Sequence, residues 1–306
     1  MLAAMVSQNS DRRARDLLLV ALAYAAALVV ALAVGWALRD RHPILVAAAA
    51  DLVATLVVFG FSVGYDNSSL YDPYWSVIPL PIAIFFTAAG KPGLGQLLLL
   101  ALVALWGARL TGNWAARWRG IRDEDFRYQE IRGRTGRFYW PASFVSIHLL
   151  PTIWVFLGLL PLYPALARPS RLTTPAVAAL IMTATAIAVE TIADRQLRAF
   201  LRTRRDPEAV LDRGLWAYCR HPNYLGEILF WWGLYLFGVA AEPAWAWSVV
   251  GPLSITLLFV FISVPWMDRR LLFRHPAWAQ TMKSLPALLP WPRRREPAVS
   301  SQRHGR

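Results

Sequence analysis

Apolar residues fill long stretches of this chain and are separated by short polar segments. Taking about 20 apolar residues as the length that crosses a bilayer, we expect transmembrane helices near 17–38, 44–64, 75–89, 94–108, 139–161, 175–194, 224–241 and 245–267. The third and fourth stretches are short enough to form a re-entrant pair instead. The pattern predicts an all-α, polytopic membrane bundle of seven or eight transmembrane helices.

The composition supports a membrane protein and excludes several other classes. Of 306 residues, 57% are hydrophobic and only 17% are charged, outside the range of ordinary soluble or disordered chains. The single cysteine, Cys219, cannot form an internal disulfide. No two His or Cys residues stand at helical ligand spacing, so no metal site is predicted. No Gly-x-Gly-x-x-Gly or Walker A sequence occurs.

The net charge of +13 is explained mostly by orientation. With eight crossings, 27 of the 32 positive residues fall on one side of the membrane, together with both chain ends. Because cytoplasmic loops retain Lys and Arg, both termini are expected to be cytoplasmic. The charge therefore predicts membrane lipids, and no nucleic acid, as a partner, and no obligate protein partner is expected. The loop 65–74 lies on the positive side yet carries no positive residue.

The most informative segment is 214–227, Gly-Leu-Trp-Ala-Tyr-Cys-Arg-His-Pro-Asn-Tyr-Leu-Gly-Glu. Pro222 suits the first turn of a helix, and Asn223 and Glu227, four apart, share one helix face. An ionisable Glu227 inside an apolar run is costly unless it faces a polar cavity. An interfacial belt of Trp, Tyr and Arg is the alternative, but the complete cluster favours a binding site.

Two further clusters carry polar residues near expected helix ends. The first contains Glu190, Asp194 and Arg198, which are spaced four apart. This spacing is typical of a binding stripe along one helix face and equally of an intrahelical salt-bridge ladder. In the segment 109–128, arginines alternate with Trp and Tyr. These arginines suit the phosphates and adenine of a nucleotide, and equally the headgroups of anionic lipids.

The segment 214–227 resembles the C-terminal signature of the steroid 5-alpha-reductase superfamily, specifically its bacterial branch of membrane proteins. The superfamily includes sterol reductases and isoprenylcysteine carboxyl methyltransferases. The resemblance extends over 65–291. It leaves two N-terminal helices in 1–64 and a basic tail, 292–306, expected to be disordered. It implies a multi-pass enzyme of the bacterial inner membrane whose active site faces the cytoplasm.

The resemblance also implies a set of binding residues. It assigns NADPH binding to Arg109, Asn113, Arg119, Asp194, Arg198, Trp216, Tyr218, Arg220, His221, Asn223, Tyr224, Glu227 and Arg270, and substrate contact to Trp75, Trp106 and Glu190. In the steroid reductases a carboxylate and a tyrosine hold the carbonyl of an enone. Asp72 takes the place of the carboxylate, at the matching interval before Arg109.

The place of the tyrosine in that pair falls at Trp106, which has an indole N–H but no hydroxyl. Tyr71 or Tyr74, beside Asp72, is therefore expected to supply the missing donor. The alternative for this loop is an interfacial aromatic turn closed by Asp-Pro.

The expected activity is NADPH-dependent reduction of a carbon–carbon double bond conjugated to a carbonyl. The substrate is expected to be a hydrophobic, steroid-like or lipid molecule that enters from the bilayer. A methyltransferase of the isoprenylcysteine type, using S-adenosylmethionine, is one alternative, although S-adenosylmethionine has no phosphate for the arginines to bind. A non-catalytic lipid-binding protein is the other, because Trp106 replaces the tyrosine.

Overall fold

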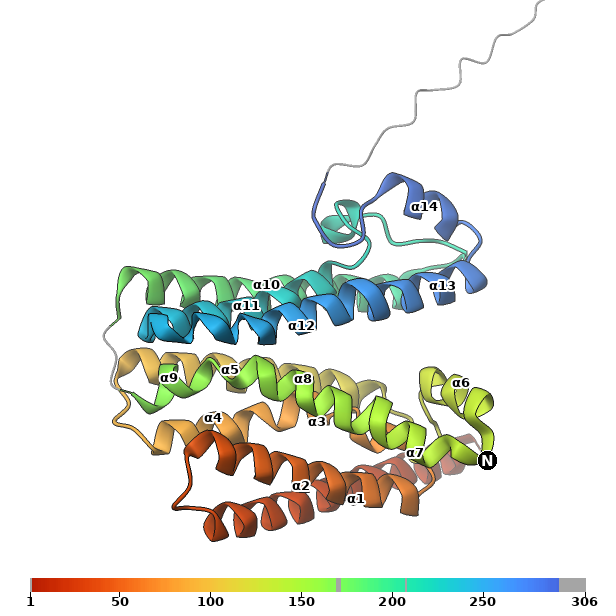
Figure 1. Ribbon diagram of the computed structural model, residues 1–306. Coiled ribbons are helices and arrows are strands. Elements are labelled where there is room, and N and C mark those ends of the chain that lie inside the picture. Colours follow the sequence, from red (N-terminus) through yellow and green to blue (C-terminus); the bar gives the residue numbers. More distant parts are fainter. Residues whose placement is uncertain (1, 169–171, 207, 292–306) are drawn as a thin grey trace, which may run out of the picture. The chain divides into compact units, whose positions relative to one another are not determined.

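The structure, a computed structural model, describes residues 2–168, 172–206 and 208–291, with side chains from Asp11 onward (Figure 1). Every regular element in these ranges is helical, which confirms the predicted all-helical fold. The α-helices are α1 Leu2–Ala37, α2 Pro43–Gly64, α3 Tyr74–Val77, α4 Pro79–Ala88, α5 Leu94–Arg117, α6 Phe126–Thr135, α7 Tyr139–Ser143, α8 Leu150–Leu159, α9 Leu162–Ala167, α10 Thr174–Thr203, α11 Pro222–Ala241, α12 Val250–Leu258, α13 Val264–Arg274 and α14 Trp278–Ser284.

Shorter helical turns link several of these helices. The 3-10 turns are η1 Ser68–Tyr71, η2 Gly136–Phe138, η4 Gly214–Ala217 and η5 Pro243–Val249, and the π-helical turns are η3 Phe144–Leu149 and η6 Phe259–Ser263. The tail expected to be disordered, 292–306, lies outside the described residues.

Seven helical stretches within the described residues are long and apolar enough to cross a membrane. They are Asp11–Ala37, Pro43–Gly64, Leu94–Arg117, Phe126–Leu159, Thr174–Thr203, Pro222–Ala241 and Pro243–Arg274. The chain is therefore a multi-pass helical membrane protein, at the lower of the two expected helix numbers.

The third expected span, 75–89, is not one helix but the two short helices α3 and α4. Pro79 starts α4, and a proline cannot continue the hydrogen bonds of the preceding turn. The pair packs on α5: the Ser76 and Thr111 hydroxyls are 2.8 Å apart, and a Cβ on Gly107 would lie 2.5 Å from the Ser76 main-chain oxygen. If this broken segment crosses the membrane, both termini lie on the same side. The placement of both termini on one side stays a prediction.

The chain divides into two compact units, and each is described by itself. Unit 1 comprises Met1–Thr183 and Trp231–Ile255, and unit 2 comprises Ala184–Phe230 and Thr256–Arg306. The division of the sequence at 64/65 and 291/292 marks the limits of the family resemblance, and it also stays a prediction.

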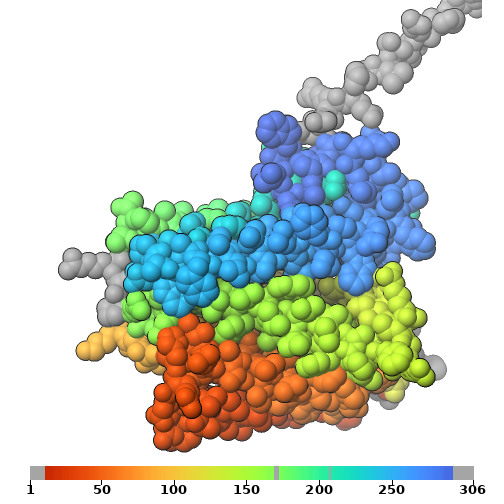
Figure 2. Space-filling model, in the orientation of Figure 1, coloured from red at the N-terminus to blue at the C-terminus, as the bar shows by residue number. Residues whose placement is uncertain are grey.

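In unit 1, α1 and α2 form an antiparallel hairpin (Figure 1), and their side chains form a continuous surface coloured red to orange (Figure 2). The start of α1 also holds the end of α5. Arg13 donates hydrogen bonds to the main-chain oxygens of Ala115 at 2.6 Å and Trp118 at 3.0 Å, and the Ile121 N–H donates to Asp16 at 3.0 Å. Arg13 thereby satisfies carbonyls that a helix end leaves without partners.

Candidate functional site

The loop between α2 and α3, which carries no positive charge, is fixed to the segment that precedes α6. Asn67 caps η1 by accepting from the Ser69 N–H at 2.7 Å, and its side-chain amide donates to the Ile121 oxygen at 2.5 Å. The Ser68 N–H donates to Glu124 at 2.9 Å, and the Asp125 N–H donates to the Ser69 hydroxyl at 2.8 Å. These contacts set the position of η1 and of the residue that follows it, Asp72.

Asp72 forms a pair with a tyrosine that the sequence analysis did not select. The Tyr128 hydroxyl, on the first turn of α6, donates to Asp72 Oδ1 at 2.5 Å. Burial raises the pKa of Asp72 to about 7, against the lowering effects of the Arg127 charge and of the Tyr128 hydrogen bond. Asp125 holds Arg127 nearby by accepting from its Nε at 2.8 Å. The result is a carboxyl group that exchanges a proton near neutral pH beside a phenolic hydroxyl.

Tyr71 and Tyr74, the donors expected from the sequence, direct their hydroxyls elsewhere. The Tyr71 hydroxyl lies 2.5 Å from the Thr152 hydroxyl, and the Tyr74 hydroxyl donates to Asp51 at 2.7 Å. Both rings are buried, which raises the pKa of each hydroxyl well above its ordinary value. These hydroxyls bond within the core of unit 1, and the phenol that bonds Asp72 in the structure is Tyr128.

The other candidates of unit 1 lie on or beside α5. Trp106 is fully buried and packs edge to face on Trp231, with ring centroids 5.4 Å apart, so it fills the core. Arg109 and Asn113 are half-buried one turn apart on α5, and Arg119 is exposed in the loop that follows. Trp75 is half-buried in α3.

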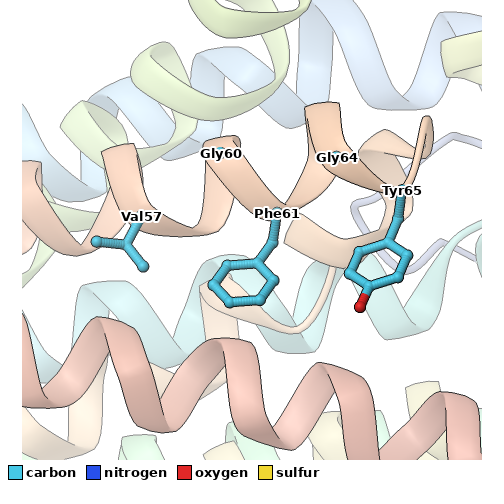
Figure 3. A pocket seen from close by; sticks show the side chains of 5 residues that line it. All are labelled: Val57, Gly60, Phe61, Gly64 and Tyr65. Carbon is cyan, nitrogen blue, oxygen red and sulfur yellow. The ribbon is translucent and has the colours of Figure 1, made fainter.

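An open pocket of about 530 Å³ lies on the face of α2 shown in Figure 3. Val57, Phe61 and Tyr65 project from the helix there, and Gly60 and Gly64 leave space between them. None of the site residues predicted from the sequence lines this pocket.

In unit 2, α10 and α11 approach each other closely at Gly226. A Cβ on Gly226 would lie 2.9 Å from the Ala186 oxygen and 2.9 Å from the Glu190 Cβ, so the helices meet here only because Gly226 has no side chain. Glu190 and Glu227 are both buried at this crossing. Asp194 and Arg198 follow Glu190 at one-turn intervals, and Asn223 lies one turn before Glu227, as the spacing predicted.

The turn η4 is held against α10. Gly214 has a positive φ of 63°, and the Leu215 N–H donates to the Gln196 side chain at 3.0 Å. The Trp216 indole donates to the Ala193 oxygen at 3.1 Å, so Trp216 serves packing, whereas Tyr218 is 51% exposed.

Arg220 and His221, expected to bind a cofactor, both contact the Asp268 carboxylate of α13. Arg220 donates to Asp268 Oδ2 at 2.8 Å, and His221 Nε2 lies 2.9 Å from Asp268 Oδ1. The Trp278 indole donates to the same Oδ1 at 3.1 Å. These groups are nearly buried, so Arg220 and His221 act here by fixing α13 and α14 beside the start of α11.

Asn223 is the residue of this motif best placed to receive a ligand. Its Oδ1 is buried and has no hydrogen-bond partner among the described residues, and such an atom is costly unless a ligand or water satisfies it. Next to it, the Tyr224 ring stacks on His221 at 5.2 Å. Arg270 lies two residues after Asp268 on α13.

A nicotinamide nucleotide fits part of this arrangement. The Asn223 oxygen accepts hydrogen bonds, as a carboxamide N–H requires, and Arg198 supplies a positive charge on the adjacent helix. Arg220 and His221 are already bonded within the protein and fit a supporting role better than direct contact.

Comparison with known proteins shows to which family the chain belongs but indicates no activity. An uncharacterised protein of Schizosaccharomyces pombe, C594.04c, is 27% identical over 247 residues, and the alignment covers 72% of each chain. No solved structure matches. The family described as "Protein of unknown function (DUF1295)" matches residues 58–280. This match covers more than half of the sequence, and the chain therefore belongs to the DUF1295 family.

Proposed function

We propose that this protein is an NADPH-dependent reductase of a carbon–carbon double bond conjugated to a carbonyl, acting on a hydrophobic, steroid-like or lipid substrate from the bilayer. The observation that carries the proposal is the pair formed by Asp72 and Tyr128, with their oxygens 2.5 Å apart. It provides the carboxyl and the phenol that the resemblance to steroid 5-alpha-reductases calls for, although the phenol comes from another position in the sequence.

Asp72 acts as the acid that polarises the substrate carbonyl. When hydride reaches the β-carbon of an enone, negative charge develops on the carbonyl oxygen, and a pre-positioned donor in a dry site stabilises it. With a pKa of about 7, raised by burial, Asp72 is substantially protonated at neutral pH. Tyr128 donates to Oδ1, so the proton on Oδ2 is left to hydrogen-bond the substrate carbonyl. That proton then neutralises the enolate oxygen.

Residues of unit 2 would hold the cofactor, which supplies a hydride when bound. Asn223 Oδ1 would accept from the nicotinamide carboxamide, and Arg198 with Asp194 would bind the polar part of the nucleotide. Arg220 and His221 keep the start of α11 in place through Asp268.

The cofactor is tested by thermal stabilisation of the purified protein with NADPH, NADH and S-adenosylmethionine. A ligand at a hundredfold its dissociation constant adds about 2.7 kcal/mol. We expect NADPH to stabilise the wild type, and expect Asn223→Ala and Arg198→Ala to weaken the effect. Arg202→Ala, one turn further along α10 and exposed, is the matched control. Stabilisation by S-adenosylmethionine alone indicates a methyltransferase, and no response to any ligand indicates a non-catalytic protein.

The acid is tested by NADPH oxidation with a 4-ene-3-ketosteroid and a medium-chain enone. We expect Asp72→Ala to lower kcat by about 10²–10³-fold, the effect of removing one donor to a developing oxyanion. Tyr128→Phe removes a hydrogen bond that lowers the pKa of Asp72, so activity should extend to higher pH than in the wild type. Tyr65→Phe, at an exposed phenol, is the control. An unchanged pH profile in Tyr128→Phe contradicts the role of the pair.

A further inference from the structure

A buried carboxyl group lies inside the membrane-spanning part of α2. Asp51 is eight residues after the first residue of α2 and thirteen before its last, or about 12 Å and 20 Å along the axis. Asp51 is only 2% exposed. Ionisable groups at this depth are costly and are generally functional.

Asp51 has one side-chain partner and an orphan oxygen. The Tyr74 hydroxyl donates to its Oδ1 at 2.7 Å and also lies 2.9 Å from its main-chain oxygen. Oδ2 is buried without a hydrogen bond, and none of the ion pairs recorded for the described residues includes Asp51. The titratable groups facing this region from the packed elements are Tyr24 of α1, Tyr71 of η1, Tyr74 of α3 and His148 of η3. None of them is a basic Lys or Arg that would neutralise a carboxylate.

A chain of hydroxyl groups begins at Thr55, one helical turn after Asp51 on α2. Among the described residues, the side chain that bonds the Asp51 carboxyl is Tyr74, so a proton must cross the gap between Asp51 and Thr55 by rotation of these groups. Thr152 donates to the His148 main-chain oxygen at 2.9 Å, so its oxygen must accept from its other two neighbours. These are the Thr55 hydroxyl at 2.7 Å and the Tyr71 hydroxyl at 2.5 Å. The directions of all three hydroxyl bonds are thereby fixed, and they lead to His148.

His148 lies in the π-helical turn η3 and joins this inner chain to an outer one. Its Nδ1 lies 3.1 Å from the Ser143 main-chain oxygen and therefore carries a proton, while its Nε2 lies 3.1 Å from the Ser62 hydroxyl. Ser62 also lies 3.1 Å from the Val58 oxygen. Ser62 donates to Nε2 when His148 is neutral and to Val58 when Nε2 is protonated, so both forms of the imidazole are satisfied.

The outer chain runs from Ser143 to the surface. Tyr139 donates to Glu124 at 2.8 Å, so Ser68 donates to Tyr139 at 2.6 Å and Ser143 donates to Ser68 at 2.8 Å. Glu124 is bound in turn by Arg132 at 3.2 Å. The side chain of Arg132 is 32% exposed, so the polar path begins at the solvent.

We propose that Asp51 is a proton-binding site within the membrane, and that the hydroxyl and imidazole groups between Asp51 and Glu124 are the route by which its proton exchanges with water. The site holds a neutral carboxylic acid at neutral pH. In exchange, Asp51 gives up one proton toward Glu124 and receives one proton in return, so no co-reactant is consumed. The hydroxyl groups and the imidazole pass the proton on, and they must rotate past the main-chain oxygens of Ser143 and His148, because an amide oxygen carries no proton to hand on.

A proton fits this site better than a metal ion. A hard cation needs about six oxygen ligands, whereas Tyr74 already donates to Oδ1 and approaches the Asp51 main-chain oxygen. An ionised carboxylate here would keep one orphan oxygen in a medium without water, and protonation removes that charge. Two links in the route are main-chain oxygens, those of Ser143 and His148. Protons pass these points only when neighbouring groups rotate, so exchange is slow.

Infrared spectroscopy tests the protonation state directly. The wild-type minus Asp51→Asn difference spectrum at pH 7 should contain the C=O stretch of a protonated carboxylic acid, shifted in D₂O. Tyr74→Phe assigns the band a second time, because loss of the hydrogen bond raises its frequency without removing the group. Asp72→Asn identifies the separate contribution of Asp72. If the wild-type minus Asp51→Asn difference spectrum at pH 7 contains only carboxylate bands, the site is ionised and the proposal is wrong.

The rate of the D₂O shift tests the route. Ser68→Ala and Tyr139→Phe each remove a hydroxyl from the chain and should slow exchange at Asp51 by about tenfold, equivalent to about 1.4 kcal/mol on the barrier. Ser76→Ala is the matched control, because Ser76 is a buried serine of the same unit that bonds to Thr111 outside the chain. If all three variants exchange at the same rate as the wild type, the route is wrong. The proton-binding site itself is then judged by the band assignment alone.

Discussion

Replacing Asp268 by alanine should destabilise unit 2 more than any exposed charge substitution. The carboxylate accepts from Arg220 at 2.8 Å, His221 at 2.9 Å and Trp278 at 3.1 Å, and its side chain is only 5% exposed. Removing one member of a buried, hydrogen-bonded charge pair costs about 3–5 kcal/mol, because the other charge is left buried. For a chain of this length, about 2 °C per kcal/mol gives a shift of about 6–10 °C.

The assay is the midpoint of thermal unfolding of the full chain in mild detergent, followed by tryptophan fluorescence. Asp206→Ala, at an exposed aspartate of the same unit, is the control and should shift the midpoint by less than about 1 °C. The double variant Arg220→Met with Asp268→Leu should recover much of the loss, because an apolar pair leaves no buried charge. If Asp268→Ala behaves like Asp206→Ala, the contacts to Arg220 and His221 do not support the fold as argued.

Three other predictions test separate features. Burial raises the pKa of Asp72 from its ordinary value of 3.8 to about 7 in the folded protein. The folded protein therefore binds the proton more tightly than the unfolded chain and loses stability as pH rises between these values, and Asp72→Asn should flatten the thermal midpoint across that window. Gly226→Ala should cost about 1–3 kcal/mol through overpacking, whereas Gly60→Ala, where nothing lies within 4 Å of a new Cβ, should cost nothing measurable by the same unfolding assay. Cys219 is buried, and burial raises the pKa of its thiol to about 11, so N-ethylmaleimide should label it only after unfolding. A cysteine introduced by Tyr218→Cys, at the exposed neighbouring position, should be labelled at once. Rapid labelling of native Cys219 would show that the segment opens.

The sequence predicted the membrane-spanning helices because long apolar runs are a local property. It did not predict the break at Pro79, because hydropathy counts that proline within an apolar run and α3 is held on α5 by two tertiary contacts, the Ser76–Thr111 hydrogen bond and the close approach of Gly107 to Ser76. Hydropathy measures neither contact. The same limitation explains why an apparent single span is in fact α3 and α4.

The candidate site shows the same division between local and tertiary information. Spacing placed Glu190, Asp194 and Arg198 at one-turn intervals along α10, as the helix has them. Tyr128 was missed because its partner, Asp72, is 56 residues away, and only the hydrogen bonds between η1 and the start of α6 bring them together. Asp125 caps α6 by accepting from the Arg127 N–H at 2.9 Å, but this local contact fixes where the helix begins and not what it faces.

The contacts of Arg13 and Asp16 bear on which fragments of the chain can be studied. The family match begins at residue 58, after α1 and most of α2. A fragment cut to that match would lose the arginine that caps α5 and the aspartate that Tyr74 binds. It would expose helix-end carbonyls and a core hydroxyl, each needing a new partner. The region shared with relatives therefore depends on helices that the family match leaves out, and a minimal expression boundary lies before residue 13.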